Sequence, residues 1–216
     1  MSTLLGWVVA RRTGIALERI GSRYGGWIVP SALTGPGRTC YLAGLGEDSS
    51  LDCALARRGC DVFVFDPTPR AIDHAATAFA GMENVRFTPV GLWSSARTLR
   101  FFAPANADHV SHSVVNLQGT SEWFEAECQT LTALMEEFGH AHIDLLKLDI
   151  EGAEFEVLRH MLGTALRPYA VCVEFDQPTA FLRVALQLWR FRRAGYRVVA
   201  TEGWNVTVVH DSARLS

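Results

Sequence analysis

Short apolar runs alternate with segments of helical spacing over residues 40–210, and this alternation constrains the fold more than any other feature of the chain. The apolar runs cover residues 40–43, 62–65, 85–90, 143–148 and 171–175, and helical patterns cover 49–59, 68–81, 130–139, 153–162 and 179–194. Strands that alternate with helices form a parallel sheet with right-handed crossovers. The sequence therefore predicts an α/β fold whose sheet is covered by helices on both faces.

The end of the chain departs from this alternation. Two further predicted strands, at 196–200 and 206–209, are joined by only five residues. That connection suits an antiparallel hairpin and is too short for a crossover helix. We therefore expect a seven-stranded, mostly parallel sheet with a C-terminal antiparallel hairpin. A dinucleotide-binding fold would usually finish with a parallel strand, so the hairpin favours a Rossmann-like methyltransferase sandwich over a dehydrogenase.

Composition is typical of one soluble domain. The 216 residues are 49% hydrophobic and carry a formal net charge of −3, so no global feature favours nucleic-acid binding. We expect a single domain over 1–216, in which an N-terminal amphipathic helix at 4–21 and a loop at 25–37 precede a core at 40–210. The apolar patch at 4–10 is too short for a membrane span and has no small-residue cleavage site, so we expect neither a span nor a signal peptide. The five cysteines form no Cys-x-x-Cys pair, which favours reduced thiols in a cytoplasmic protein.

A glycine-rich turn follows the first core strand. It has the sequence Gly44-Leu45-Gly46-Glu47-Asp48, and the next helix begins near Ser49. Such a turn lets the backbone approach a ligand closely, and the helix offers free N–H groups. By itself it could also be an ordinary strand–helix turn.

An acidic residue strengthens the ligand-binding interpretation. Asp66 ends the second strand, twenty residues after Gly46, where a carboxylate can accept hydrogen bonds from ribose hydroxyls. Pro67 and Thr68 follow, and Thr68 is the expected cap of the next helix. The glycine turn and this carboxylate together predict a binding site for a nucleoside. NAD and S-adenosylmethionine both contain one, so the site does not distinguish between them.

Two carboxylates, Asp149 and Glu151, come directly after the fourth strand. They could bind the ammonium group of a methionine moiety or orient an acceptor hydroxyl, and a carboxylate can act as the base that a poorly nucleophilic alcohol needs. They could equally be helix-start carboxylates, and Lys147 could pair with either. Glu174 and Asp176 end the fifth strand, so four carboxylates on two adjacent strand ends could hold Mg²⁺, although we favour substrate polarity or plain surface charge.

The segment 91–129 has the least regular pattern. Residues 97–102 could form an extra strand, and 106–120 has the polarity of a loop. His112, with His109 nearby, is a candidate base or hydrogen-bonding group on the substrate side, or part of an ordinary polar loop. Trp93 could lie against an adenine ring or pack in the core.

Three blocks of sequence carry a resemblance to a known family, together with Gly91-Leu92-Trp93 and Val173-Glu174-Phe175. They are Gly44 to Asp52, Val64 to Pro69, and Lys147-Leu148-Asp149-Ile150-Glu151-Gly152-Ala153-Glu154. The chain resembles the FkbM family, also called methyltransferase family 21, over roughly residues 40–210. The resemblance implies a class I methyltransferase fold, S-adenosylmethionine as methyl donor, and an oxygen of a sugar, glycolipid or polyketide as the usual acceptor.

The resemblance also implies roles for particular residues. Gly44, Gly46 and Glu47 would line the methionine and ribose, Asp66 would hold the ribose hydroxyls, and Asp149 would sit beside the transferred methyl group. The neighbouring positions Leu45, Asp48, Pro67, Thr68 and Trp93 complete the expected cofactor site. One position departs from the pattern, because many methyltransferases carry an acid two residues before the first glycine and this chain has Leu42. Glu47 or Asp48 could substitute in binding the methionine ammonium.

We therefore expect an S-adenosylmethionine-dependent O-methyltransferase that modifies a hydroxyl of a small molecule, with Asp149, Glu151 and His112 as catalytic candidates. A homodimer is one of the oligomeric states that the sequence leaves open. A NAD-dependent oxidoreductase is the first alternative, but no tyrosine accompanies the only lysine of the chain, Lys147. A non-catalytic binding module with the same fold is the second. A nucleic-acid methyltransferase would need a basic face or an Asn-Pro-Pro-Tyr-like motif after the fourth strand, where this chain has Asp149-Ile150-Glu151-Gly152.

Overall fold

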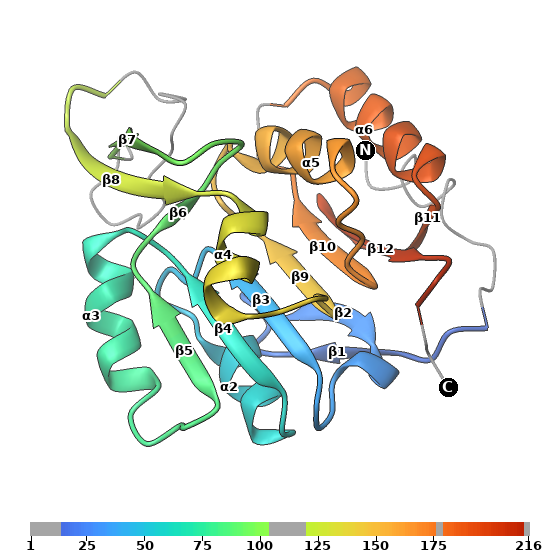
Figure 1. The fold of residues 1–216 in the computed structure, drawn as a ribbon, viewed down its shortest axis with the longest axis horizontal. Coiled ribbons are helices and arrows are strands. Elements are labelled where there is room, and N and C mark those ends of the chain that lie inside the picture. The colour runs from blue at the N-terminus through green and yellow to red at the C-terminus, as the bar shows by residue number, and fades with distance from the viewer. Residues whose placement is uncertain (1–13, 104–119, 176–178, 214–216) are drawn as a thin grey trace.

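The computed structural model describes residues 14–103, 120–175 and 179–213, which form a central sheet covered by helices on both faces (Figure 1). The sheet has seven strands in the order β11-β12-β10-β9-β3-β4-β5. In chain order these strands are β3 (Thr39–Ala43), β4 (Asp61–Phe65), β5 (Val85–Thr88), β9 (Leu145–Leu148), β10 (Ala170–Glu174), β11 (Tyr196–Glu202) and β12 (Asn205–His210).

Six of the seven strands share one direction. The pairs β3–β4, β3–β9, β4–β5 and β9–β10 are parallel, whereas β12 is antiparallel to both β10 and β11. The predicted seven-stranded, mostly parallel sheet with an antiparallel hairpin at its end is therefore confirmed, and with it the class I methyltransferase fold. The order changes direction between β3 and β9, where ligands bind in open α/β sheets.

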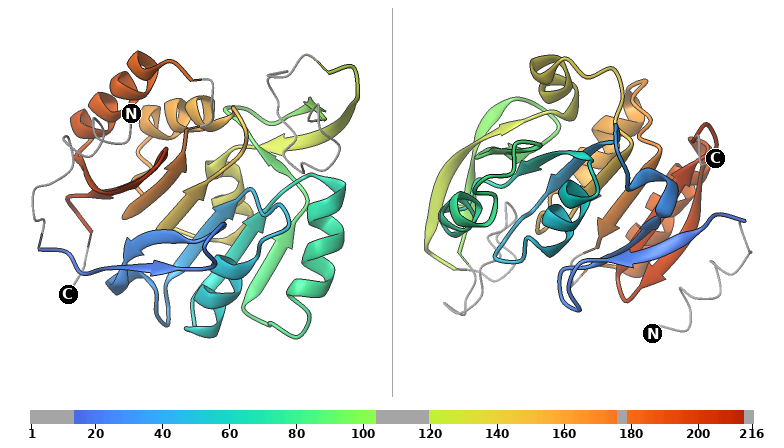
Figure 2. Two further views of the ribbon diagram at one scale, coloured as in Figure 1. Left: turned by 180° about the vertical axis from the view of Figure 1, so that it is seen from behind. Right: turned by 90° about the horizontal axis from the view of Figure 1, so that it is seen from below.

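Within the described residues, five α-helices cover the sheet. They are α2 (Ser50–Arg57), α3 (Pro69–Ala78), α4 (Leu131–Phe138), α5 (Glu154–Gly163) and α6 (Phe181–Arg193). Helices α2 and α3 lie on one face and α4, α5 and α6 on the other (Figures 1 and 2). Successive residues of β3 point to opposite faces, so Cys40 and Leu42 pack toward the first group while Tyr41 and Ala43 pack toward the second.

Several helices begin or end at residues that favour helix termini. Thr130 caps α4 by accepting a hydrogen bond from the Ala133 N–H at 3.1 Å, and Gly139 ends this helix with a left-handed backbone. Pro69 stands in the first turn of α3, where a missing N–H costs nothing. Ser49 and Thr68 stand at the N-cap positions of α2 and α3, but neither side chain makes a capping hydrogen bond. The Ser49 hydroxyl pairs with His74 instead, and the Thr68 hydroxyl donates to Asp66.

The prediction of an N-terminal helix reaching residue 21 is wrong. Residues Leu17–Ile20 form strand β1, which pairs antiparallel with β2 (Trp27–Pro30), and a short 3₁₀ turn, η1 (Ser31–Leu33), follows. The predicted loop at 25–37 thus contains a strand. Ile20, Trp27 and Val29 are buried in the same cluster as α2, so pairing with β2 buries apolar side chains that an isolated helix would expose. Residues 14–16 are not helical either, and residues 4–13 of the predicted helix lie outside the described residues.

A separate three-stranded sheet, in the order β6-β8-β7, accounts for part of the irregular segment. Its strands are β6 (Gly91–Leu92), β7 (Arg97–Phe102) and β8 (Trp123–Gln129), so the extra strand expected at 97–102 is confirmed. This sheet extends beyond the carboxyl ends of the parallel strands (Figure 1). In the three described ranges, no helix combines the length and apolar character needed to cross a membrane.

Candidate active site

A pocket of about 260 Å³ opens at the carboxyl edge of the sheet. Its walls come from the turn after β3, the ends of β4, β9 and β10, the β1–β2 hairpin, the small sheet and the start of β12. The lining residues are Tyr24, Gly25, Trp27, Gly44, Leu45, Gly46, Glu47, Asp48, Leu51, Asp52, Phe65, Asp66, Pro67, Thr68, Gly91, Leu92, Phe101, Lys147, Asp149, Ile150, Glu151, Ala153, Glu174 and Asn205.

Asp66 shapes the glycine turn at one wall of this pocket. One carboxylate oxygen accepts hydrogen bonds from the N–H groups of Leu45 and Gly46 at 2.9 and 3.0 Å. The other accepts from the N–H and hydroxyl of Thr68 at 2.9 and 2.7 Å. A carboxylate has about four acceptor positions, so the protein itself occupies the positions of this buried side chain. Asp66 therefore holds the turn in shape, whereas Glu47, on the same turn, lines the pocket and is exposed.

Gly44 and Lys147 join the glycine turn to the end of β9. The Lys147 ammonium donates a hydrogen bond to the Gly44 carbonyl and forms an ion pair with Asp149 at 3.1 Å. Burial opposes the charge on Lys147, but the carboxylates of Asp149 and Asp52 outweigh it and raise the pKa of this lysine. A buried cation thus fixes Asp149 against the turn.

Two other carboxyl groups at this edge have raised pKa values. Burial, reinforced by the charges of Asp149 and Glu151, raises the pKa of Glu174 to about 7. Burial also raises the pKa of Asp52 to about 6. Glu151 adopts a left-handed backbone, with φ of 49°, and is the first residue of the turn into α5. Such strain in a non-glycine residue is common at functional sites.

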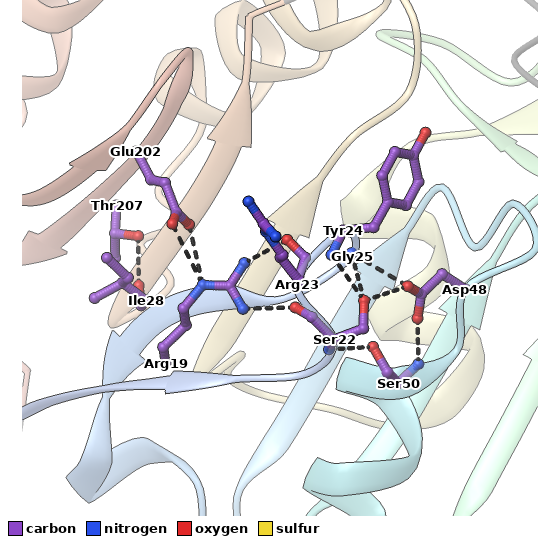
Figure 3. Close-up of polar contacts among 10 residues, drawn as sticks. All are labelled: Arg19, Ser22, Arg23, Tyr24, Gly25, Ile28, Asp48, Ser50, Glu202 and Thr207. Carbon is purple, nitrogen blue, oxygen red and sulfur yellow. Dashed lines mark hydrogen bonds and ion pairs between the residues drawn. The ribbon is translucent and has the colours of Figure 1, made fainter. Parts of the chain in front are cut away.

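The β1–β2 hairpin is fastened to the glycine turn by a polar network (Figure 3). The Ser22 hydroxyl donates to Asp48 at 2.5 Å, and the Gly25 N–H donates to Ser22 and Asp48 at 2.8 and 3.2 Å. Ser50, at the start of α2, accepts from the Ser22 N–H at 2.7 Å. The network holds Tyr24, which is 90% exposed, at the mouth of the pocket.

Most residues expected in the site lie together. Ten of the predicted positions line the pocket: Gly44, Leu45, Gly46, Glu47, Asp48, Asp66, Pro67, Thr68, Asp149 and Glu151. Trp93 does not line the pocket; it follows β6, whose residues Gly91 and Leu92 do. His112, His109 and Asp176 lie outside the described residues. Within the described ranges, no group of three or more histidine, cysteine or acidic side chains is arranged to hold a metal ion.

The pocket also includes residues that sequence reasoning missed. Tyr24, Gly25 and Trp27 come from the hairpin, Phe101 from β7 and Asn205 from β12. No local motif marks them, because each reaches the site through strand pairing distant in sequence. Glu174, the last residue of the apolar strand β10, lines the pocket as well.

Comparison with known proteins decides the family. A sequence model of the methyltransferase FkbM domain matches residues 44–198, well over half of the chain. This chain belongs to the FkbM methyltransferase family. The match begins at the glycine turn and ends in β11, so it includes the acidic ends of β4, β9 and β10.

The curated relatives share less than a third of their aligned residues with this chain. The chain is 29% identical over 123 residues to a probable methyltransferase-like protein 24 of Rattus norvegicus, covering 56% of this chain and 28% of the relative. The human protein of that name is 27% identical over 123 residues, with 56% and 27% covered. The chain thus spans a little over a quarter of the length of these relatives.

Solved structures with related folds share little sequence. A TehB-like SAM-dependent methyltransferase from Corynebacterium glutamicum is 16% identical with a TM-score of 0.44, and 83% of each chain is covered. A precorrin-6y C5,15-methyltransferase from Geobacter metallireducens is 11% identical with a TM-score of 0.47, covering 83% of this chain and 85% of the other.

Proposed function

We propose that this chain transfers a methyl group from S-adenosylmethionine to a hydroxyl of a small-molecule acceptor. The observation that carries the proposal is the meeting, in one pocket, of the glycine turn held by Asp66 with the Lys147–Asp149 pair of the family block. Membership of the FkbM family supports the donor and the type of reaction.

The pocket residues fit a nucleoside-bearing donor. The turn from Gly44 to Gly46 presents backbone at the pocket wall, where it can lie close to a ligand. Glu47 offers its carboxylate to ribose hydroxyls, while Asp66 acts by holding the turn. Apolar side chains of Phe65, Leu92 and Phe101 provide surface for a flat base.

The donor supplies an electrophilic methyl group on a sulfonium centre. In the proposed reaction the acceptor oxygen forms a bond to the methyl carbon, the carbon–sulfur bond breaks, and its electron pair stays on sulfur. The hydroxyl proton passes to a carboxylate of the protein. Such a displacement depends mainly on alignment and exclusion of water.

Asp149, Glu151 and Glu174 are the three candidates for the general base. Asp149 forms an ion pair with Lys147, and this fixed position suits it to orienting a substrate. Glu174 has a pKa of about 7, close to the value at which a general base is most effective. We propose that Glu174 accepts the proton while Asp149 and Glu151 position the reactants.

The charge of the pocket bears on the acceptor. Seven acidic residues line it: Glu47, Asp48, Asp52, Asp66, Asp149, Glu151 and Glu174. Among the described lining residues the single Lys or Arg is Lys147. Such a lining attracts a cationic donor and repels phosphates and carboxylates. We therefore propose a neutral hydroxyl compound, such as a sugar, a glycolipid or a polyketide, as acceptor.

The test is calorimetric titration with S-adenosylmethionine, S-adenosylhomocysteine and NAD⁺, each with Mg²⁺ and with chelator. We expect both adenosyl ligands to bind, independently of Mg²⁺, and NAD⁺ to give no heat. Binding of NAD⁺ alone would favour the oxidoreductase, and heat from none of the three would favour a non-catalytic module. A positive result is followed by a screen of neutral hydroxyl acceptors with labelled donor.

A further inference from the structure

Helix α6 presents an apolar stripe on the side opposite the core. Its inward residues are Val184, Gln187 and Phe191, all at most 1% exposed. The outward side carries Leu182, Leu186 and Trp189, which are 80%, 46% and 55% exposed. Their spacing of four and three residues places them on one face of the helix. The helix lies on the outside of the molecule, beside α5 (Figures 1 and 2).

Positive charge surrounds this stripe. The helix contains Arg183, Arg190, Arg192 and Arg193 and no acidic residue. Arg183 stacks on Phe155 of α5, and Arg193 lies over the Trp189 ring at 5.4 Å. In the described parts of the chain, no ion pair neutralises Arg190, Arg192 or Arg193. The outer face of α6 therefore combines exposed leucine and tryptophan with unneutralised guanidinium groups.

A second copy of the chain is a poor occupant for this face. In a twofold interface the same patch meets itself. Since α6 carries no acidic residue, the arginines at its end would be buried in such an interface with no carboxylate of either α6 to neutralise them. Burial of unpaired guanidinium groups opposes an interface of this kind.

An anionic lipid surface matches both properties of the face. Helices that lie in a membrane interface place leucine and tryptophan at the headgroup boundary and keep arginines beside anionic headgroups. We propose that α6 is a membrane-surface docking helix that binds anionic bilayers through Leu182, Leu186 and Trp189, with Arg190, Arg192 and Arg193 contacting lipid phosphates. This inference does not depend on methyl transfer.

The test is co-sedimentation of the full chain with vesicles of phosphatidylcholine alone and with vesicles of equal parts phosphatidylcholine and phosphatidylglycerol. We expect binding only to the anionic vesicles, weakened by salt. Replacing both Leu182→Ser and Trp189→Ser should abolish it. Replacing Arg190→Gln and Arg193→Gln should weaken partitioning about thirtyfold, since each basic residue contributes about 1 kcal/mol.

The matched control is Trp123→Ser, which removes a tryptophan of similar exposure, 46%, from β8. It should bind vesicles like the parent chain. Circular dichroism checks folding, and Leu186→Ser replaces the double variant if that variant does not fold. The proposal is overturned if the parent chain ignores anionic vesicles, or if the α6 and Trp123 variants bind alike. Dimerisation that is lost in the α6 variants, without vesicle binding, would assign the face to a second copy.

Discussion

At the scale of single residues, Gly44 is the position with the least freedom to change. Its N–H donates to the Phe65 carbonyl at 2.9 Å, and its own carbonyl accepts from Lys147. Its φ is +83°, and an added Cβ would stand 1.6 Å from the Asp149 carbonyl oxygen. The close approach of two backbones, and not only the left-handed conformation, therefore requires glycine here.

Gly44→Ala should lower the free energy of unfolding by more than about 3 kcal/mol and remove binding of S-adenosylhomocysteine, because β3 and β9 must separate at the pocket. Urea denaturation and calorimetry measure the two effects. Gly139→Ala is the control, since Gly139 has a similar φ of +72° but open space around its Cβ position. Gly139→Ala should lower the free energy of unfolding by about 1–2 kcal/mol, because the left-handed conformation is unfavourable for alanine. Equal losses in the two variants would show that the contact with Asp149 is unimportant.

Spacing along the chain predicted that the turn and Asp66 lie together, but not the hydrogen bonds that Asp66 accepts from the protein. A carboxylate twenty residues after Gly46 suits a ribose contact, yet its four hydrogen bonds go to the protein. Spacing reports which strand ends are adjacent, whereas hydrogen-bond partners depend on the local path of the backbone. The same limit applies to Trp93, which follows β6 and does not line the pocket, whereas Gly91 and Leu92 of that strand do.

At the scale of elements, the β1–β2 hairpin and α2 behave as one unit through Asp48. Burial opposes ionisation of this carboxyl, but hydrogen bonds from Ser22, Ser50 and Gly25 outweigh it and lower the pKa of Asp48. The ionised carboxylate is therefore favoured in the folded chain, and its contribution to stability is lost as pH falls below the ordinary pKa of an aspartate and through the lowered pKa of Asp48.

A double-mutant cycle with Ser22→Ala and Asp48→Asn should give a coupling energy of about 1–2 kcal/mol, since their direct hydrogen bond involves a charged group. Urea denaturation at neutral pH supplies the four unfolding free energies. The control cycle combines Ser212→Ala, at an exposed serine, with Asp48→Asn. Its coupling energy should be near zero. Additive losses for Ser22 and Asp48 would mean that the hairpin and the turn are energetically independent.

This hairpin was the part of the fold that sequence reasoning could not find. Each of its strands has only four residues, too few to distinguish a strand period from a helical one. Their stability comes from pairing with each other and from packing of Ile20, Trp27 and Val29 against α2, which are tertiary effects. The core strands were predictable because burial on both faces makes β3, β4, β9 and β10 continuous apolar runs.

At the scale of the whole molecule, acidic groups with raised pKa values make stability depend on pH. Glu174 titrates near 7 in the folded chain and near 4.5 when unfolded, so between these values the folded state binds more protons. The free energy of unfolding must then fall as pH rises through this window. Asp52, raised from 3.8 to about 6, acts in the same direction at lower pH.

Glu174→Gln removes the contribution of one group and leaves Asp52 in place. Relative to the parent chain, the variant should gain about 1 kcal/mol between pH 5 and pH 8, a figure reduced for the partial exposure of Glu174. Urea denaturation at the two pH values provides the comparison. Glu83→Gln, at an exposed position after α3, should shift stability equally at both. A constant offset for Glu174→Gln as well would contradict the raised pKa.

The fastening of the β1–β2 hairpin to Asp48 has a practical consequence for anyone who shortens this protein. The recognised family segment starts at residue 44, which invites truncation just before the glycine turn. Such a fragment would lose Tyr24, Gly25 and Trp27 from the pocket wall and would leave the Asp48 carboxylate without its serine donor. Domain boundaries drawn from sequence kinship alone would thus cut through the binding site, and fragments intended for ligand screening should retain residue 14 onward.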